Sequence, residues 1–436
     1  MRIRNCPHSV TLIYVNCTFQ QRIWFPQAGA RGCPASSRRA YTSRDQKKNN
    51  PRPESSVLND RFFMNRLLTK CPTYASLALC PCNPLVPLKS TMIALSFITL
   101  AISSVAHAAT YGVTDTFIGS SFLSGFNHEA IVDPTHGRVN YVDQSTAQRL
   151  NLTYANGNTF ILRADYTTTL SASGAGRNSV RIISKKQWDN HVQIMDVRHM
   201  PQGCGTWPAY WTTSSTVSWP SDGEIDIIEG VNDQAPNAAT LHTTPGCTQP
   251  VIRDQTGTTT STDCNWQVNS NTGCGVRNPL ANSYGPQFNA NGGGWYAMER
   301  TKTYIKVWFW PRNSATVPAQ VKNGSGSINT SSWGTPFAAF VNSSCDLDSK
   351  FGPNNIIINL TFCGDWAGSV YGSSGCPGAC VDYVNNNPSA FKNAYWDIAA
   401  LRVYQPDKRP SCCRLENFRL YQEWNAYMAK RRQHTR

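Results

Sequence analysis

Between residues 109 and 405 the chain carries many short runs of β-branched and aromatic residues and almost no helical repeat of apolar residues. Gly, Asn, Pro and Asp separate these runs, which is typical of strands joined by turns. The clearest strand candidates are residues 158–166, 178–186, 191–200, 303–310, 354–362 and 396–405. The sequence therefore predicts an all-β fold. The region has no internal repeat, which favours one two-sheet sandwich over a propeller or two small domains.

Two local features of this region make more specific predictions. The turn signal Trp188-Asp189-Asn190 separates two candidate strands, so we predict that residues 178–186 and 191–200 form a hairpin. Residues 245–294 are rich in Gly, Asn, Thr and Cys, and we expect them to form the largest loop. Long loops on a rigid sheet are where a binding cleft is commonly built.

A short apolar segment precedes this region. Residues 92–108 read MIALSFITLAISSVAHA, which begins at a methionine and ends in a small-x-small motif, as a secretory signal peptide does. The segment is shorter than the ~20 residues that a membrane-spanning helix needs. We therefore predict cleavage before Ala109, a secreted extracellular domain over residues 109–405, and no membrane association after cleavage.

Most of the positive charge lies at the two ends of the chain. Residues 1–91 hold 14 Lys and Arg against 3 acidic residues, and residues 406–436 hold 8 against 3. We expect the first segment to be a non-native or disordered basic extension, and the second to be a basic tail outside the fold. The region between them is close to neutral and has no base-stacking or phosphate-binding motif, so no nucleic-acid partner is predicted. We expect a monomer without a cofactor.

The cysteines also indicate secretion. An even number of cysteines in a chain with a signal peptide predicts disulfides, and eight lie in the mature region: Cys204, Cys247, Cys264, Cys274, Cys345, Cys363, Cys376 and Cys380. The sequence does not determine their pairing. The spacing of Cys376 and Cys380 also fits half of a zinc site, but a second His/Cys pair is missing, so we predict no metal site. Glycosylation sequons occur at Asn151, Asn323, Asn329, Asn342 and Asn359, the last within a candidate strand.

Three acidic residues lie in the run SDGEIDIIEG, residues 221–230. Successive side chains of a strand point to opposite faces, so Glu224 and Asp226 share one face while the isoleucines pack on the other. Strict alternation would place Glu229 with the isoleucines. A bulge at Ile227-Ile228 would return Glu229 to the acidic face, and we therefore predict a bulged strand.

Three carboxylates on one face repel one another, and the repulsion grows as water is excluded. A solvated acidic surface is one interpretation, but flanking aromatic residues and glycines favour chemistry. Two carboxylates about 5 to 5.5 Å apart, on either side of a glycosidic bond, perform retaining hydrolysis. A third that shares a proton separates the pKa values of the other two.

Aromatic residues lie near the acids in the sequence. GTWPAYW, residues 205–211, and Trp219 precede them, and flat aromatic rings can pack on the apolar faces of sugar rings. His242, in ATLHT, lies on the next candidate strand, and Trp366, in CGDWAG, follows another. Taken alone, an aromatic residue or a histidine is more often an ordinary packing residue, but clustering just before the acidic strand favours a functional role for Trp211 and Trp219. For Trp366 a binding role and a packing role are equally supported.

The acidic run resembles the signature of glycoside hydrolase family 16 in its bulged form. GTWPAYW before it, NAATLHT after it, CGDWAG and YWDIAALRVYQ resemble segments of fungal secreted laminarinases of that family, which cut β-1,3 and mixed β-1,3/1,4 glucans. The resemblance covers residues 109–405. It implies a concanavalin-like β-sandwich, or jelly roll, of two curved antiparallel sheets with a glycan cleft on the concave face. It also implies endo-1,3(4)-β-glucanase activity on a β-glucan polysaccharide.

The resemblance assigns roles residue by residue. Glu224 falls on the nucleophile, Glu229 on the acid/base and Asp226 on the assisting carboxylate. Substrate-binding roles fall on Trp211, Trp219, His242, Arg181 and Trp366. Some family members carry a structural calcium ion, but no ligands for one are identified here. Two alternatives remain open, a cell-wall glucan transglycosylase of the same fold and a non-catalytic glucan-binding lectin.

Overall fold

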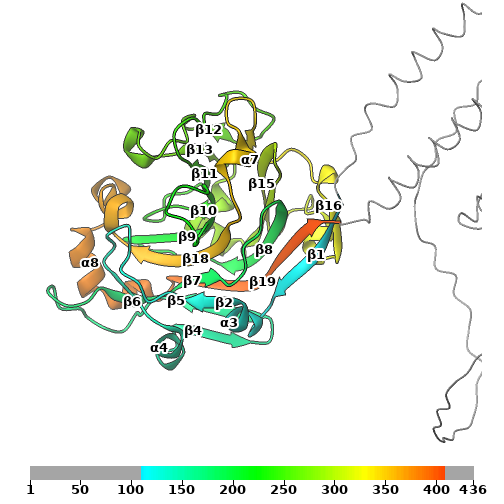
Figure 1. Cartoon of the computed structure of the whole chain (residues 1–436). Coiled ribbons are helices and arrows are strands. Elements are labelled where there is room, and N and C mark those ends of the chain that lie inside the picture. The colour runs from blue at the N-terminus through cyan, green and yellow to red at the C-terminus, as the bar shows by residue number, and fades with distance from the viewer. Residues whose placement is uncertain (1–109, 408–436) are drawn as a thin grey trace, which may run out of the picture. The chain divides into compact units, whose positions relative to one another are not determined.

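Residues 110–407, which are the residues that this computed structural model describes, form two large β-sheets whose strands all pair antiparallel (Figure 1). The first, sheet A, runs in the order β16 (Ser327–Asn329), β1 (Thr110–Phe117), β19 (Tyr395–Pro406), β8 (His191–His199), β14 (Gly294–Arg300), β15 (Tyr304–Pro311) and β17 (Ala338–Val341). Beside β19 it also includes β5 (Thr159–Arg163), which in turn pairs with β4 (Thr153–Asn156).

Sheet B carries the acidic run in its middle. Its order is β12 (Thr258–Thr259), β13 (Cys274–Arg277), β11 (Ala238–His242), β10 (Glu224–Glu229), β9 (Thr206–Thr213), β18 (Asn355–Phe362), β7 (Arg181–Ser184) and β2 (Phe126–His128). A separate parallel pair joins β3 (Val139–Tyr141) to β6 (Arg177–Ser179). The confirmed fold class is therefore an all-β sandwich.

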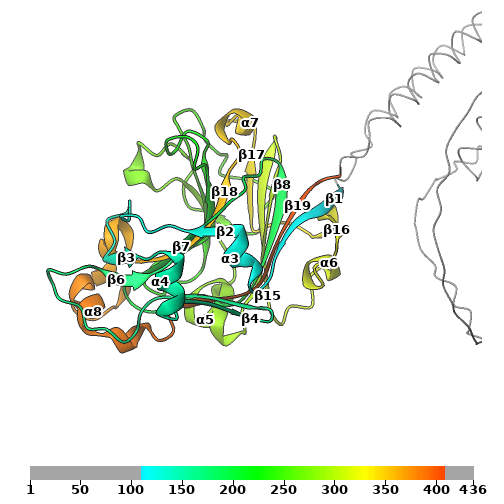
Figure 2. The same cartoon turned by 60° about the horizontal axis from the view of Figure 1, so that its bottom comes forward.

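The helices are short and lie in the connections between strands (Figure 2). The α-helices are α3 (Ser121–Gly125), α4 (Gln144–Arg149), α5 (Gly285–Ala290), α6 (Ala319–Lys322), α7 (Leu347–Lys350) and α8 (Cys380–Asn386). The remaining turns are η1 (Asn269–Asn271), η2 (Ala281–Ser283), η3 (Thr330–Ser332), η4 (Gly364–Gly368), η5 (Tyr371–Ser374) and η6 (Pro388–Phe391). Within residues 110–407, no helix has both the length and the apolar character that crossing a membrane requires.

The main core contains side chains from both sheets, which is how a sandwich buries its apolar area. Ile225 and Ile358 of sheet B and Met298 and Val307 of sheet A are fully buried in it. A second cluster combines Trp295, Trp308 and other residues of sheet A with Val321 of α6 and with Trp333, which follows η3. These side chains cover part of the face of sheet A that points away from the main core.

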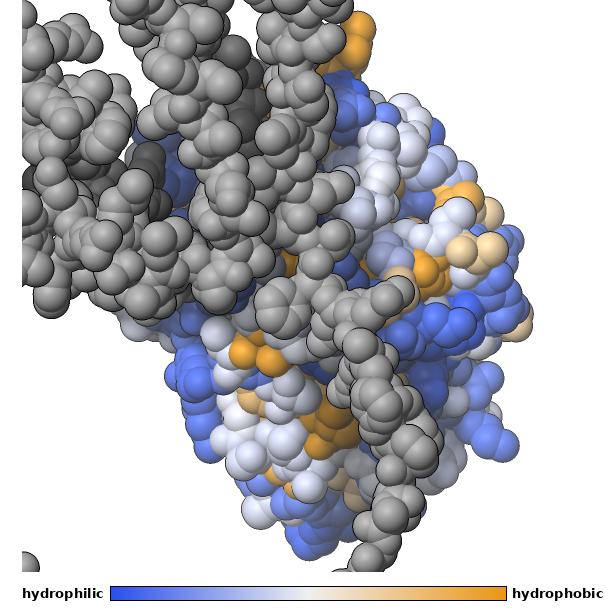
Figure 3. Space-filling model, turned by 90° about the vertical axis from the view of Figure 1, so that its right-hand side faces the viewer, coloured by the Kyte–Doolittle hydropathy of each residue, from blue (hydrophilic) through white to orange (hydrophobic). Residues whose placement is uncertain are grey.

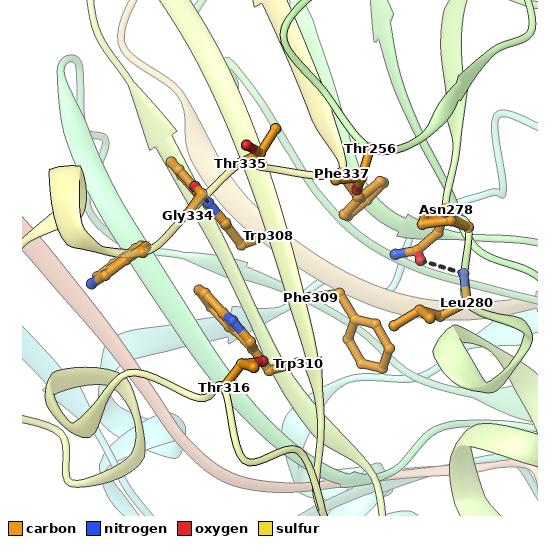
Figure 4. A pocket seen from close by; sticks show the side chains of 12 residues that line it. Thr256, Asn278, Leu280, Trp308, Phe309, Trp310, Thr316, Gly334, Thr335 and Phe337 are labelled. Carbon is orange, nitrogen blue, oxygen red and sulfur yellow. Dashed lines mark hydrogen bonds between the residues drawn. The ribbon is translucent and has the colours of Figure 1, made fainter.

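The surface and the cavities of the sandwich do not by themselves mark a site. On the side shown in Figure 3, the visible surface of residues 110–407 is mainly hydrophilic, with small separate hydrophobic patches. A cavity of about 280 Å³ lies beside β15, where Trp308, Phe309 and Trp310 meet Asn278 and Leu280 (Figure 4). None of the three acidic residues of β10 lines this cavity. We therefore locate the candidate functional site from the positions of the three acidic residues of β10.

All six candidate strands are present, but the predicted hairpin is wrong. β7 pairs with β18 and β2 in sheet B, whereas β8 pairs with β14 and β19 in sheet A. The turn at 188–190 connects β7 of sheet B to β8 of sheet A. The Trp188 side chain in this turn is buried in the core between the two sheets. Residues 245–294 also contain more regular structure than a loop, since β12, β13 and α5 lie within them.

The eight cysteines of the mature region form four disulfides. The pairs are Cys204–Cys376, Cys247–Cys345, Cys264–Cys274 and Cys363–Cys380. The zinc interpretation of Cys376 and Cys380 is therefore wrong, because each thiol is bonded to a different partner. The predicted leader, signal peptide and most of the basic tail lie outside the described residues.

One sequon is inaccessible to a glycosyltransferase, and this yields a prediction. Asn359 is buried on β18, where its amide oxygen accepts a hydrogen bond from Trp211 Nε1 (2.8 Å) and its amide nitrogen donates one to Tyr141 Oη (3.2 Å). We expect peptide mapping of protein secreted by a eukaryotic host to show Asn359 unmodified, in contrast to the exposed Asn323. A glycan on Asn359 in folded protein would contradict the packing described for β18.

Candidate active site

The acidic strand β10 lies between β9 and β11 and contains one extra residue relative to both. Asp226 pairs with Trp211 on β9, and Glu229 pairs with Ala209, so the four residues 226–229 of β10 oppose three residues of β9. The same shift occurs against β11. The predicted bulge is thus confirmed. It lets all three isoleucines of β10 be fully buried while Glu224 and Glu229 stay partly exposed.

A buried asparagine closes the bulge. The side-chain oxygen of Asn237 accepts a hydrogen bond from the Glu229 backbone amide (3.0 Å), and its side-chain nitrogen donates to the Ile227 carbonyl (2.9 Å). These are backbone groups that an irregular ladder can leave without a strand partner. Asn237 therefore fixes the position of the strand at Glu229. The sequence analysis assigned no role to Asn237, although the residue lies in the quoted run NAATLHT.

Glu224 lies among groups that favour its charged form. Trp219 Nε1 donates a hydrogen bond of 2.7 Å to Glu224 Oε2, and His242 is the cross-strand partner of Glu224 on β11. Burial raises the pKa of Glu224 above its ordinary value, although His242, the Trp219 hydrogen bond, Arg181 and a hydrogen bond with Asp226 act in the opposite direction. These four groups stabilise a carboxylate at this position against the effect of burial.

Glu229 lies in a different environment. Trp207 Nε1 donates a hydrogen bond of 2.9 Å to Glu229 Oε1. Burial raises the pKa of Glu229 to about 7, although the Trp207 hydrogen bond and His242 favour the carboxylate. A carboxyl group with this pKa holds a proton up to neutral pH and can donate it.

Asp226 and His242 form the buried part of the site. His242 Nε2 lies 3.4 Å from Asp226 Oδ2, a distance at which the contact is an ion pair rather than a tight hydrogen bond. Burial, Glu224 and Glu229 raise the pKa of Asp226. Burial would lower the pKa of His242, but the contact with Asp226 and the charges of the three acids outweigh it and raise the pKa to about 10. The cluster therefore retains protons that isolated groups would lose.

Two of the predicted substrate-binding residues, Trp211 on β9 and Arg181 on β7, lie together across the intervening strand β18. Trp211 on β9 donates to Asn359 on β18, and the guanidinium carbon of Arg181 lies 5.0 Å from the centre of the Trp211 ring. Arg181 also forms an ion pair of 2.7 Å with Glu129. These contacts fix the Trp211 ring beside Asp226, its partner across the strands.

Further indole rings line the surroundings of the acids. Trp366, on η4, packs edge-on against Trp207, the hydrogen-bond donor to Glu229, with ring centres 5.6 Å apart. Trp266 packs in the same way against Trp219 at 5.4 Å. The sequence analysis did not single out Trp207 or Trp266. Trp207 lies in the quoted run GTWPAYW, whereas nothing in the sequence around Trp266 marks it as part of the site.

Glu224, Asp226 and His242 each offer one atom within 4.8 Å of the others, a spacing that a metal ion could use. Two of the three are already engaged, since Glu224 Oε2 accepts from Trp219 and His242 Nδ1 pairs with Asn271 at 2.9 Å. We interpret the group as a set of carboxyl and imidazole groups that share protons.

Two carboxyl groups on one strand and among indole rings form an arrangement that an enzyme cleaving glycosidic bonds could use. The family model described as "XgeA-like, catalytic GH16 domain" matches residues 126–404, and the chain belongs to glycoside hydrolase family 16. The sequence-based predictions of family and enzyme class are thereby confirmed.

Relatives with known names agree with this assignment. The chain is 44% identical over 303 residues to a Schizosaccharomyces pombe protein named "Probable glycosidase", a match that covers 68% of this chain and 70% of that protein. It is 40% identical over 312 residues to an endo-1,3(4)-β-glucanase of Emericella nidulans, covering 69% of this chain and 48% of the relative. The chain thus spans about half the length of most of the curated relatives that it matches.

Solved structures are also similar. Laminarinase 16A from Phanerochaete chrysosporium, solved with two β-glucans in its donor and acceptor sites, is 66% identical with a TM-score of 0.67; the match covers 68% of this chain and 100% of that one. An elongating family 16 β-1,3-glucosyltransferase is 42% identical with a TM-score of 0.64 and the same coverage.

The role of Asn237 in the bulge yields a stability prediction. Asn237→Ala leaves the Glu229 amide and the Ile227 carbonyl unpaired, and each unpaired buried group costs about 1–3 kcal/mol. We expect urea denaturation to show a free energy of unfolding lower by about 2 kcal/mol or more, together with reduced kcat. The matched control is Asn278→Ala, which removes a buried amide that bonds only one backbone group, Leu280 N. Wild-type stability and turnover in Asn237→Ala would refute the role.

The different environments of the two glutamates predict a bell-shaped pH profile of kcat/KM. Glu224 must be ionised, so activity rises with pH until its proton is lost. Glu229 must be protonated, so activity falls as pH rises through its pKa of about 7. Trp207→Phe removes a hydrogen bond that favours the Glu229 carboxylate, and should move the basic limb to higher pH. A basic limb at the same pH in this variant would contradict the assignment.

Proposed function

We propose that this domain is a secreted, monomeric, retaining endo-1,3(4)-β-glucanase in which Glu224 is the nucleophile and Glu229 is the acid and then the base. The observation that carries the proposal is the difference between the two environments. Burial raises the pKa of both glutamates, but four neighbouring groups favour the charged form of Glu224, whereas two favour that of Glu229, whose pKa rises to about 7. The four disulfides favour an oxidising compartment.

In the first step a Glu224 carboxylate oxygen attacks the anomeric carbon while Glu229 gives its proton to the leaving oxygen. The glycosidic bond breaks, and a glycosyl ester forms on Glu224. The Trp219 hydrogen bond to Glu224 Oε2 holds this carboxylate in place for the attack.

In the second step the ionised Glu229 takes a proton from water, and the water oxygen displaces Glu224 at the anomeric carbon. The product regains the β configuration, and both glutamates return to their starting protonation states. Asp226 lies between the two glutamates on β10 and pairs with His242. The protons that Asp226 and His242 share keep the net charge of the buried cluster low.

The substrate class follows from the relatives. The Emericella nidulans relative is named an endo-1,3(4)-β-glucanase, and the Phanerochaete chrysosporium enzyme is named a laminarinase and was solved with β-glucans. The exposed rims of Trp219, Trp266 and Trp366 provide flat apolar surfaces of the kind on which pyranose rings pack. We propose that these rings line the positions on either side of the cleavage site.

Transfer to a second glucan is an alternative to hydrolysis. The similar glucosyltransferase is described as elongating, and a mutant laminarinase 16A, 65% identical to this chain, is described as cyclising laminariheptaose. Both fates begin with the same glycosyl ester, so the acids do not distinguish between them. A glucan-binding lectin would use the aromatic rings but would not require three clustered acids.

The test is incubation of purified protein with laminarin and, separately, with a mixed-linkage β-glucan, while NMR follows the anomeric configuration of the first products. We expect β-configured oligomers of mixed length, and loss of at least ~10³-fold in kcat for Glu224→Gln and for Glu229→Gln, each still folded. Products longer than a defined input oligosaccharide would favour transfer. First-formed α products would refute retention, and binding without cleavage would favour the lectin.

A further inference from the structure

One short loop contacts the partners of both Glu224 and Asp226. The disulfide Cys264–Cys274 closes this loop, residues 264–274, whose two ends are only ten residues apart. The loop presents Trp266 to the ring of Trp219 and Asn271 to the ring of His242. Trp219 in turn donates to Glu224, and His242 faces Asp226.

We infer that Asn271 is a positioning residue, which holds the His242 ring so that Nε2 faces Asp226 and Glu224. This inference rests on the proposed function for the identity of the reaction. Asn271 Oδ1 lies 2.9 Å from His242 Nδ1 and therefore accepts the Nδ1 proton. The opposite ring nitrogen is then the one that lies 3.4 Å from Asp226 Oδ2.

The contact orients His242 because an imidazole ring has two nitrogens that differ only in their partners. Without an acceptor at Nδ1, the ring is free to turn about the Cβ–Cγ bond, a torsion with broad minima. Charged groups that face the ring come from β10, namely Glu224, Asp226 and Glu229. Asn271 is the neutral partner on the opposite side.

The backbone of the loop is strained where Asn271 lies. Asn269, Ser270 and Asn271 have φ values of 51°, 55° and 58°, so three consecutive residues that are not glycine adopt the left-handed conformation. This conformation costs roughly 1–2 kcal/mol per residue, and strain of this kind clusters at functional sites. The disulfide holds both ends of the loop, which allows the strained turn to persist.

The loop also packs tightly on the strand that carries His242. A Cβ atom at Gly273, where φ is 61°, would lie 2.9 Å from His242 Cε1 and 2.6 Å from the Leu241 carbonyl oxygen. Only glycine permits this approach. The histidine ring is thus enclosed by Gly273 on one side and bonded by Asn271 at Nδ1.

A purely structural role is the competing explanation, in which the bond only stabilises the loop. The two roles differ in what they change. Loss of a positioning contact changes the His242 ring and kcat, with little effect on KM, whereas loss of a loop contact changes the melting temperature alone.

The test compares four variants of the full protein with wild type, the fourth being the conservative replacement Asn271→Asp. Asn271→Gly removes the side-chain amide and introduces a residue that readily adopts the left-handed backbone conformation. Asn271→Ala removes the same amide without introducing a glycine. Asn269→Gly is the matched control, because it relieves the same strained turn without touching His242. The readouts are kcat and KM on laminarin, the melting temperature, and the ¹⁵N chemical shifts of the His242 ring.

We expect both Asn271 variants to lower kcat on the order of tenfold or more, with KM within about twofold of wild type, and to change the His242 ring shifts. Asn269→Gly should match wild type in these readouts. Asn271→Asp, which keeps an acceptor and tolerates the backbone, should restore most of the turnover. Unchanged ring shifts with kcat near that of Asn269→Gly would overturn the inference.

The ring shifts do not depend on catalysis. If wild-type protein cleaves no glucan, the proposed function fails, while the shift comparison still decides whether Asn271 orients His242. If one Asn271 variant does not fold, the other and Asn271→Asp provide the same comparison.

Discussion

A single extra residue in β10 is the feature on which the site depends. Strands alternate their side chains, so a regular strand could not present Glu224, Asp226 and Glu229 on one face. The bulge supplies the shift, with residues 226–229 of β10 opposite three residues of each neighbouring strand. It also allows Ile227 and Ile228 to be buried together. The same bulge therefore allows the isoleucines to pack in the core and places the acids on one face.

Three carboxyl groups this close repel one another when ionised, and the neighbouring side chains offset this repulsion differently at each carboxyl group. Indole nitrogens donate to the two outer glutamates, while His242 places positive charge beside Asp226 and Glu224. Burial raises the pKa of both glutamates, more neighbouring groups oppose this effect at Glu224, and the pKa of Glu229 rises to about 7. The different roles that we propose for the two identical side chains rest on these different neighbours.

Much of the framework could be predicted from local patterns. The candidate strands and the bulge follow from alternation, because burial of one strand face determines which side chains must turn inward. The hairpin prediction failed because a turn sequence does not reveal whether the chain stays in one sheet or crosses to the other. The partners of the acids were only partly predictable. Trp219 lies near them in sequence, but Asn237 and Asn271 act through bonds that depend on the paths of loops.

The most direct test of the role of Glu224 is to trap the glycosyl ester. A laminaribiosyl fluoride with fluorine at C2 of the reacting sugar reacts slowly enough for the ester to accumulate, and mass spectrometry of the digested protein locates the label. Labelling of the peptide at Glu224 is expected, with none in Glu224→Gln. A label on Glu229 or Asp226, or inhibition without any covalent adduct, would contradict the assignment of the nucleophile.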